Sequence, residues 1–179
     1  MIKRGGARRI SRLLHAAAVI LLAVLVSGCA VTSTTVMDEE VVTNTKPMST
    51  YKALLIRDFE MKRELYTDTP ENRMGERDRM YARMPSELAE SIERYARSHK
   101  IFPEIFRNGQ PTERTLVLKG KFTRVGRFRI SITGTLHDGA TDQEVAYFRQ
   151  TLWDVLDTAA ALAMLARETA DFIDRIQYK

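Results

Sequence analysis

The fold is decided by residues 115–153, which read TLVLKGKFTRVGRFRISITGTLHDGATDQEVAYFRQTLW. From Phe128 to His137, apolar or glycine positions alternate with Arg, Ser, Thr and His positions. This alternation is typical of a strand with one buried and one solvated face, as in antiparallel sheets. A second alternating strand is predicted over residues 115–123, and a third strand, with apolar residues on both faces, over residues 144–153. Asp138-Gly139 is a hairpin signal. Three successive strands without an intervening helix predict an antiparallel sheet.

The segments on either side of this stretch add further strands and two helices. Residues 53–56 are consecutively apolar, which predicts a strand covered on both faces, and residues 102–106 suit a short edge strand. One helix is expected to open at Pro85 and to end near Lys100, and a second is expected over residues 158–176. We therefore expect an α+β two-layer sandwich, a mostly antiparallel sheet of about four to five strands with two helices packed on one face.

Two segments show neither the helical nor the strand period of apolar residues. Residues 29–50 are rich in threonine and suit a flexible tether, with a short edge strand over Val36 and Val41-Val42 as the alternative. Residues 61–84 alternate charges of both signs and suit a long loop, either functional or simply solvated. The predicted organisation is a targeting segment over 1–28, a tether over 29–50 and a single periplasm-facing α+β domain over 51–179.

The first 28 residues have the composition of a secretory signal peptide. Five basic residues without an acid precede an apolar run from Leu13 to Val26, which ends in the small residues Ser27 and Gly28. The run has 14 residues, whereas a membrane-spanning helix needs roughly 20. Cleavage after Gly28 is expected, and an uncleaved signal-anchor helix is the alternative.

The residues Leu25-Val26-Ser27-Gly28-Cys29 resemble the lipobox of bacterial lipoproteins. The resemblance implies lipid attachment to the Cys29 thiol, cleavage between Gly28 and Cys29, and acylation of the new amino group. Two or more acyl chains give stable membrane anchoring, whereas one gives marginal binding. Ala30 stands where an Asp would retain enteric-type lipoproteins in the inner membrane. The resemblance thus implies the inner leaflet of an outer membrane, with the domain facing the periplasm.

The charge of the chain depends on the same segment. The 179 residues carry a formal net charge of +5, and five of the 28 basic residues lie in residues 1–28. The remainder has 28 less 5, or 23, basic residues against 23 acidic ones. The pI of about 9.5 therefore belongs to the targeting segment and does not indicate nucleic-acid binding. A single cysteine excludes an intrachain disulfide framework.

The sequence contains no phosphate-binding Gly-rich loop, no serine nucleophile elbow and no adjacent metal-ligand set. We therefore expect no enzymatic activity, no catalytic or metal-binding residue and no cofactor besides the lipid on Cys29. One local feature is basic, because residues 114–129 hold six Lys and Arg residues and no acid. Lys119, Lys121 and Arg129 form a candidate docking patch for an acidic partner, lipid headgroups or an anionic polymer. A solvated sheet face is the alternative reading.

The order of elements is similar to that of small envelope lipoprotein domains. The residues behind this resemblance are Arg57-Asp58-Phe59, Glu87-Leu88-Ala89 and the strand over 116–120, and the families are the curli-secretion lipoprotein, the lipoprotein activators of penicillin-binding proteins and the amino-terminal domain of TolB. The resemblance implies an accessory or interaction subunit of an envelope transport, secretion or cell-wall machine, with an envelope protein as partner. A periplasmic module that binds lipid or another small apolar ligand is the alternative, and an envelope hydrolase is the third.

Overall fold

The computed structural model describes residues 35–43 and 46–177. Its six-stranded sheet has the order β1-β6-β5-β4-β2-β3. The antiparallel pairs join β1 (Thr35–Val42), β6 (Glu144–Trp153), β5 (Arg129–Asp138) and β4 (Thr115–Arg124), and the alternation of polar and apolar residues predicted such pairing for β4 and β5. The strands β2 (Ala53–Ile56) and β3 (Glu104–Phe106) join in parallel. The α+β prediction is confirmed, but the sheet has six strands rather than four to five.

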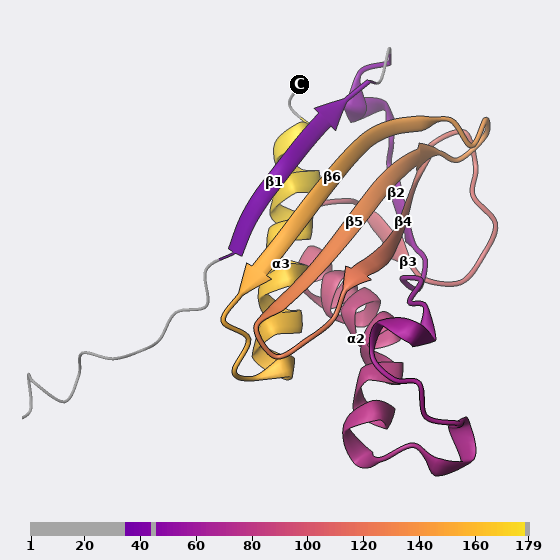
Figure 1. The fold of residues 1–179 in the computed structure, drawn as a ribbon. Helices are drawn as coiled ribbons and strands as arrows, with labels where there is room; N and C mark the ends of the chain where they lie inside the picture. Colours follow the sequence, from indigo (N-terminus) through magenta and orange to yellow (C-terminus); the bar gives the residue numbers. More distant parts are fainter. Residues whose placement is uncertain (1–34, 44–45, 178–179) are drawn as a thin grey trace, which may run out of the picture. The chain divides into compact units, whose positions relative to one another are not determined.

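Both helices, α2 (Glu76–Ser98) and α3 (Thr158–Ile176), cover the same face of this sheet, as Figure 1 shows. The space between the sheet and the helices is filled by buried apolar side chains. Phe148 of β6 and Phe172 of α3 meet there with ring centroids 5.1 Å apart. The largest fully buried side chains include Leu54, Ile56, Met84, Leu88, Ile92, Leu116, Leu118 and Ile130. This packing does not favour the alternative of an apolar ligand held between the two layers.

The sixth strand is β1, and it corrects the tether predicted for residues 29–50. Residues 35–42 pair with β6 as an edge strand, which is the alternative that Val36 and Val41-Val42 allowed. Met48 and Tyr51, at the end of the predicted tether, are buried in the core. The tether prediction failed because a strand that pairs on one side only needs little apolar alternation of its own.

The second correction concerns residues 61–84. This segment contains two 3-10 turns, η2 (Arg63–Leu65) and η3 (Glu71–Arg73), and the first nine residues of α2, which begins at Glu76 rather than at Pro85. Tyr66 packs edge-to-face on Tyr81 at 6.2 Å, and the Thr67 hydroxyl donates to Asp78. Pro85 lies inside α2, so the proline that suggested a helix start is tolerated within the helix at the loss of one backbone hydrogen bond.

The described helices include none that is both long and apolar enough to cross a membrane. Residues 1–34, which hold the predicted signal peptide, the cleavage site after Gly28 and the lipidation site Cys29, lie outside the described residues.

Candidate functional site

The face of the sheet opposite the helices carries the candidate site. Figure 1 views the sheet from this side, with α2 and α3 behind it. Because side chains alternate along a strand, the apolar core residues of β4, β5 and β6 point toward the helices and their polar neighbours line the other face. We call this surface the open face.

A hollow of about 650 Å³ lies on the open face, and we call it the open-face hollow. Residues of the four antiparallel strands contribute to it. They are Asp38, Lys121, Thr123, Arg124, Arg129, Ser131, Thr133, Tyr147, Arg149, Thr151 and Trp153. Four of these side chains are cationic and one is a carboxylate, so the lining favours an anionic ligand.

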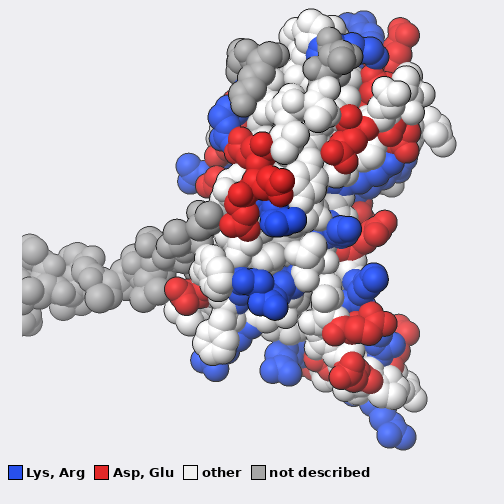
Figure 2. Space-filling view, turned by 45° about the horizontal axis from the view of Figure 1, so that its top comes forward, with Lys and Arg blue, Asp and Glu red and all other residues white. Residues whose placement is uncertain are grey.

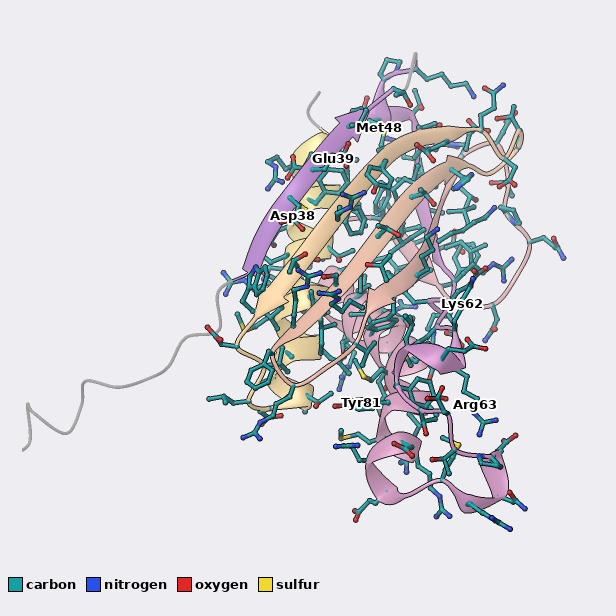
Figure 3. All side chains as sticks on the ribbon, in the orientation of Figure 1. Asp38, Glu39, Met48, Lys62, Arg63 and Tyr81 are labelled. Carbon is teal, nitrogen blue, oxygen red and sulfur yellow. The ribbon has the colours of Figure 1, made fainter. Side chains whose placement is uncertain are left out.

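Hydroxyl groups form part of the lining. The hydroxyls of Ser131 and Thr151 lie 3.1 Å apart, and Thr151 donates to Asp38 Oδ2 at 2.5 Å. Asp38 reaches this position because the register of β1 shifts between Met37 and Glu39, which leaves Asp38 as the extra residue of a β-bulge. Figure 3 labels Asp38 and Glu39 on β1 at the edge of the sheet.

The arginines of the hollow are held in place by aromatic side chains. The guanidinium of Arg129 lies 4.9 Å from the centroid of the Trp153 ring, and its buried Nε has no hydrogen-bond partner within the described part of the chain. A hydrogen bond to Tyr147 raises the pKa of Arg149 further above its ordinary value, so Arg149 is a permanent cation. Arg149 also lies 3.8 Å from Glu39, at an exposed pair that contributes little energy.

The structure divides the predicted docking patch. Lys121 and Arg129 line the open-face hollow, whereas Lys119 pairs with Asp142 at 2.6 Å. The sequence prediction did not include Arg149 and Trp153 in the patch, because β6 carries apolar residues on both faces and its outward positions were not separable by pattern. The signal that was available is the pairing of β5 with the next strand, which brings Trp153 opposite Arg129.

A second hollow of about 710 Å³ is lined by charges that already pair with one another. Arg107 pairs with Asp58, and Arg97 lies 2.9 Å from Glu93. Arg57 donates to the carbonyl of Gly109 at 3.2 Å. Because two of its three cations pair with its two carboxylates, this hollow is a weaker candidate for a charged ligand.

The two histidines of the described chain have separate partners. His99 caps the C-terminal end of α2 and stacks on Tyr95 at 4.0 Å. His137 lies on β5, with its ring nitrogens 2.9 Å from the carbonyl of Asp142 and 3.0 Å from the Thr135 hydroxyl. Among residues 35–43 and 46–177, no group of three or more His, Cys, Asp and Glu side chains is placed to hold a metal ion.

Charges of both signs are interspersed over the surface that Figure 2 presents. This agrees with the equal numbers of acidic and basic residues after residue 28. The open-face hollow is thus a local concentration of cations on a balanced surface.

Comparison with known proteins shows the fold. The chain matches no protein-family model and no curated protein. Its structure is similar to a point variant of the PelC dodecamer from Paraburkholderia phytofirmans, with a TM-score of 0.52 at 12% identity over 80% of this chain and 98% of that chain. Protein XCC0632 from Xanthomonas campestris, of the family DUF330, gives a TM-score of 0.44 at 16% identity over 77% of this chain and 88% of that one. The likeness to PelC shows a shared α+β fold, and the resemblance to small envelope lipoprotein domains stays a prediction.

Proposed function

We propose that this protein is a lipid-anchored envelope lipoprotein that acts without catalysis, as an interaction subunit of an envelope transport, secretion or cell-wall machine. The observation that carries the proposal is the lipobox-like run Leu25–Cys29 at the end of an apolar signal segment. The first strand of the folded domain begins only six residues after Cys29, at Thr35. A chain anchored in this way holds its domain at the membrane, where an envelope assembly works.

The open face is the docking surface in this proposal. Its hollow presents the cations Lys121, Arg124, Arg129 and Arg149, which suit an acidic segment of a partner protein. The protein with the similar fold is a dodecamer, so copies of this chain are one partner to test.

The anchor is tested by feeding cells a fatty-acid analogue and comparing the wild type with Cys29→Ala. Label in the wild type alone, together with loss of membrane association in the variant, is expected. Equal labelling of both proteins contradicts the anchor.

The docking surface is tested by crosslinking in intact envelopes. The double variant Lys121→Glu with Arg149→Glu is expected to lose the crosslinked partner, because it replaces two of the four cations of the hollow with carboxylates. Arg79→Glu, an exposed charge reversal on α2, is the matched control and keeps the partner. Identical crosslinks in all three proteins contradict docking at the open face. The mass of the crosslinked species shows whether the partner is another copy.

A further inference from the structure

Exposed apolar side chains gather at one end of the sheet. Phe128 precedes β5 and is 72% exposed, while Trp153 ends β6 and is 44% exposed. Leu156, in the loop from β6 to α3, is also 72% exposed. The backbone joins the two loops, because Asp154 N–H donates to the carbonyl of Phe128 at 2.9 Å. We call Phe128, Trp153 and Leu156 the apolar tip.

Both loops that carry the apolar tip are packed against the core of the domain. Val155 is buried in the core, and Val125 packs against the core from the other loop. Each loop thus packs one valine against the core, buried at Val155 and partly buried at Val125, whereas Phe128 and Leu156 face solvent. Phe128 and Leu156 are therefore exposed on loops that are themselves packed against the core. Large apolar side chains that are exposed next to one another in this way mark an interaction site.

Two arginine side chains lie over the aromatic rings of the apolar tip. Arg127 lies 6.0 Å from the Phe128 ring centroid and Arg129 lies 4.9 Å from the Trp153 ring centroid. The two acids nearby are Asp154 and Asp157, and the carboxylate of Asp157 accepts from Ala159 N and Ala160 N to cap α3. Aromatic side chains flanked by arginine suit the boundary between lipid tails and phosphate headgroups.

The position of the tip follows from chain length. From Cys29 to Thr35 the chain advances six residues, which span about 21 Å when fully extended. Thr35 pairs with Leu152, the neighbour of Trp153, so the anchored residue lies within this reach of the end of the sheet that carries the tip. Figure 1 shows β1 beginning at the same end as the turn before β5 and the loop after β6.

We propose that the apolar tip docks onto the phospholipid surface in which the protein is anchored, with Phe128, Trp153 and Leu156 entering the headgroup region. Arg127 and Arg129 contact lipid phosphates beside them. This inference rests on the lipid anchor of the proposed function and adds a second, protein-borne contact that orients the domain. One acyl-anchored point leaves a domain free to turn, whereas a second contact leaves the open face at a fixed angle to the membrane.

The test uses Trp153, which is the single tryptophan of the sequence, so selectively excited tryptophan emission reports on the tip alone. Lipidated protein is purified from membranes and reconstituted into vesicles of phosphatidylethanolamine and phosphatidylglycerol, with or without lipids brominated near the headgroup. Bromine quenches tryptophan only at short range, so we expect strong quenching in the wild type. Phe128→Ser with Leu156→Ser is expected to reduce the quenching at least twofold. Val41→Ser with Met80→Ser, which changes the other large apolar side chains exposed among the described residues, leaves it unchanged.

Vesicle flotation separates the two proposals. Protein that floats with the vesicles but shows no quenching of Trp153 is anchored without a docked tip, which overturns the inference and keeps the anchor. Quenching that is equal in the wild type and in the Phe128→Ser, Leu156→Ser variant also overturns it. Loss of an oligomer in that variant without any lipid quenching assigns the tip to a contact between copies and overturns it as well. Failure of the wild type to float removes the anchor and the inference together.

Discussion

At the scale of single residues, two glycines of the sheet lie against aromatic rings. A Cβ placed on Gly120 lies 2.2 Å from the Phe59 ring, and one placed on Gly134 lies 2.2 Å from Cζ of Phe148. Both positions face the helices, where the sheet must admit a large side chain close to its backbone. Glycine is required at these positions for space rather than for backbone freedom.

Gly134→Ala is expected to lower the free energy of unfolding by about 1–3 kcal/mol, because Phe148 is fully buried against Phe172 and cannot move aside without disturbing the core. Urea denaturation followed by circular dichroism measures the change. Gly126→Ala is the matched control, since its nearest neighbouring atom outside the adjacent residues is the Arg129 carbonyl oxygen at 3.8 Å. Equal midpoints for Gly134→Ala and the wild type contradict the packing argument.

Asp138 is a buried carboxylate that joins the chain after β1 to the β5–β6 hairpin. Its oxygens accept hydrogen bonds from Lys46 Nζ at 2.7 Å and from the Tyr51 hydroxyl at 2.9 Å, as well as from the backbone of Ala140 and Thr141. Burial alone raises the pKa of Asp138, but these hydrogen bonds outweigh it and hold the pKa well below its usual range. The carboxylate is therefore charged in the folded protein under all ordinary conditions.

Because the pKa of Asp138 is lower in the folded than in the unfolded state, its charge stabilises the fold above about pH 4, and this stabilisation is lost as the pH falls toward the folded-state pKa. Asp138→Asn is expected to cost about 2 kcal/mol at pH 7, and the difference from the wild type shrinks below about pH 4. Urea titrations at several pH values measure this. Asp142→Asn, whose side chain is 70% exposed, is the control and is expected to leave stability nearly unchanged, because an exposed ion pair contributes little. A pH-independent difference contradicts the linkage.

At the scale of elements, α2 continues through a proline. Pro85 has no N–H for the carbonyl of residue 81, so α2 lacks one interior hydrogen bond. Residues on both sides hold the helix together, since Met84 and Leu88 are fully buried. Tertiary packing thus overrides a local helix breaker.

Pro85→Ala is expected to raise the free energy of unfolding by about 1 kcal/mol, because it restores the missing hydrogen bond and removes the clash of the proline ring with the preceding turn. Thermal unfolding measures the change, and an exposed substitution elsewhere on α2, Ala82→Gly, should shift stability in the opposite direction. An unchanged or lowered melting temperature for Pro85→Ala indicates that the ring contributes packing that alanine lacks.

The elements that could be predicted from the sequence are those with a clear period. The helix over 158–176 has the predicted bounds, and the strand predicted over 128–137 is shifted by one residue in β5, because each buries a full face with regular spacing. The strand β1 was given only as an alternative, since Asp38, Glu39 and Glu40 interrupt any apolar pattern. The three acids are explained by their partners in the fold, which are the Thr151 hydroxyl, Arg149 and Arg175. These partners lie on distant parts of the chain, so the local sequence does not reveal them.

The candidate site could be predicted only in part, because the sequence shows which residues are basic but not which of them the strand register brings together. The basic run of residues 114–129 is visible in the sequence, and Lys121 and Arg129 do reach one hollow. The sequence does not reveal that Lys119 is neutralised by Asp142 or that Arg149 completes the hollow, because both facts depend on the register between strands. A one-residue change of register would move each of these side chains to the opposite face.

At the scale of the whole molecule, position and charge are set by different parts of the chain. In the proposed function, the short span from Cys29 to Thr35 limits how far the domain moves from its anchor, which a tether of more than about 20 residues would not do. Residues 35–42, which were predicted to lie in a spacer, are therefore part of the folded domain as β1. The arrangement favours function by contact at a membrane over reach across the periplasm.

Removal of residues 1–28 is expected to change the charge of the protein from strongly basic to balanced, because the segment holds all five surplus positive charges. Isoelectric focusing of the membrane-extracted protein measures this. Mature protein should focus near neutral pH, whereas protein from cells in which the lipoprotein signal peptidase is inhibited should focus near the pI of the full chain, about 9.5. A basic isoelectric point without the inhibitor shows that residues 1–28 are retained as a signal anchor. In that case the domain is held by a protein helix in place of lipid, and Cys29 is no longer the attachment point.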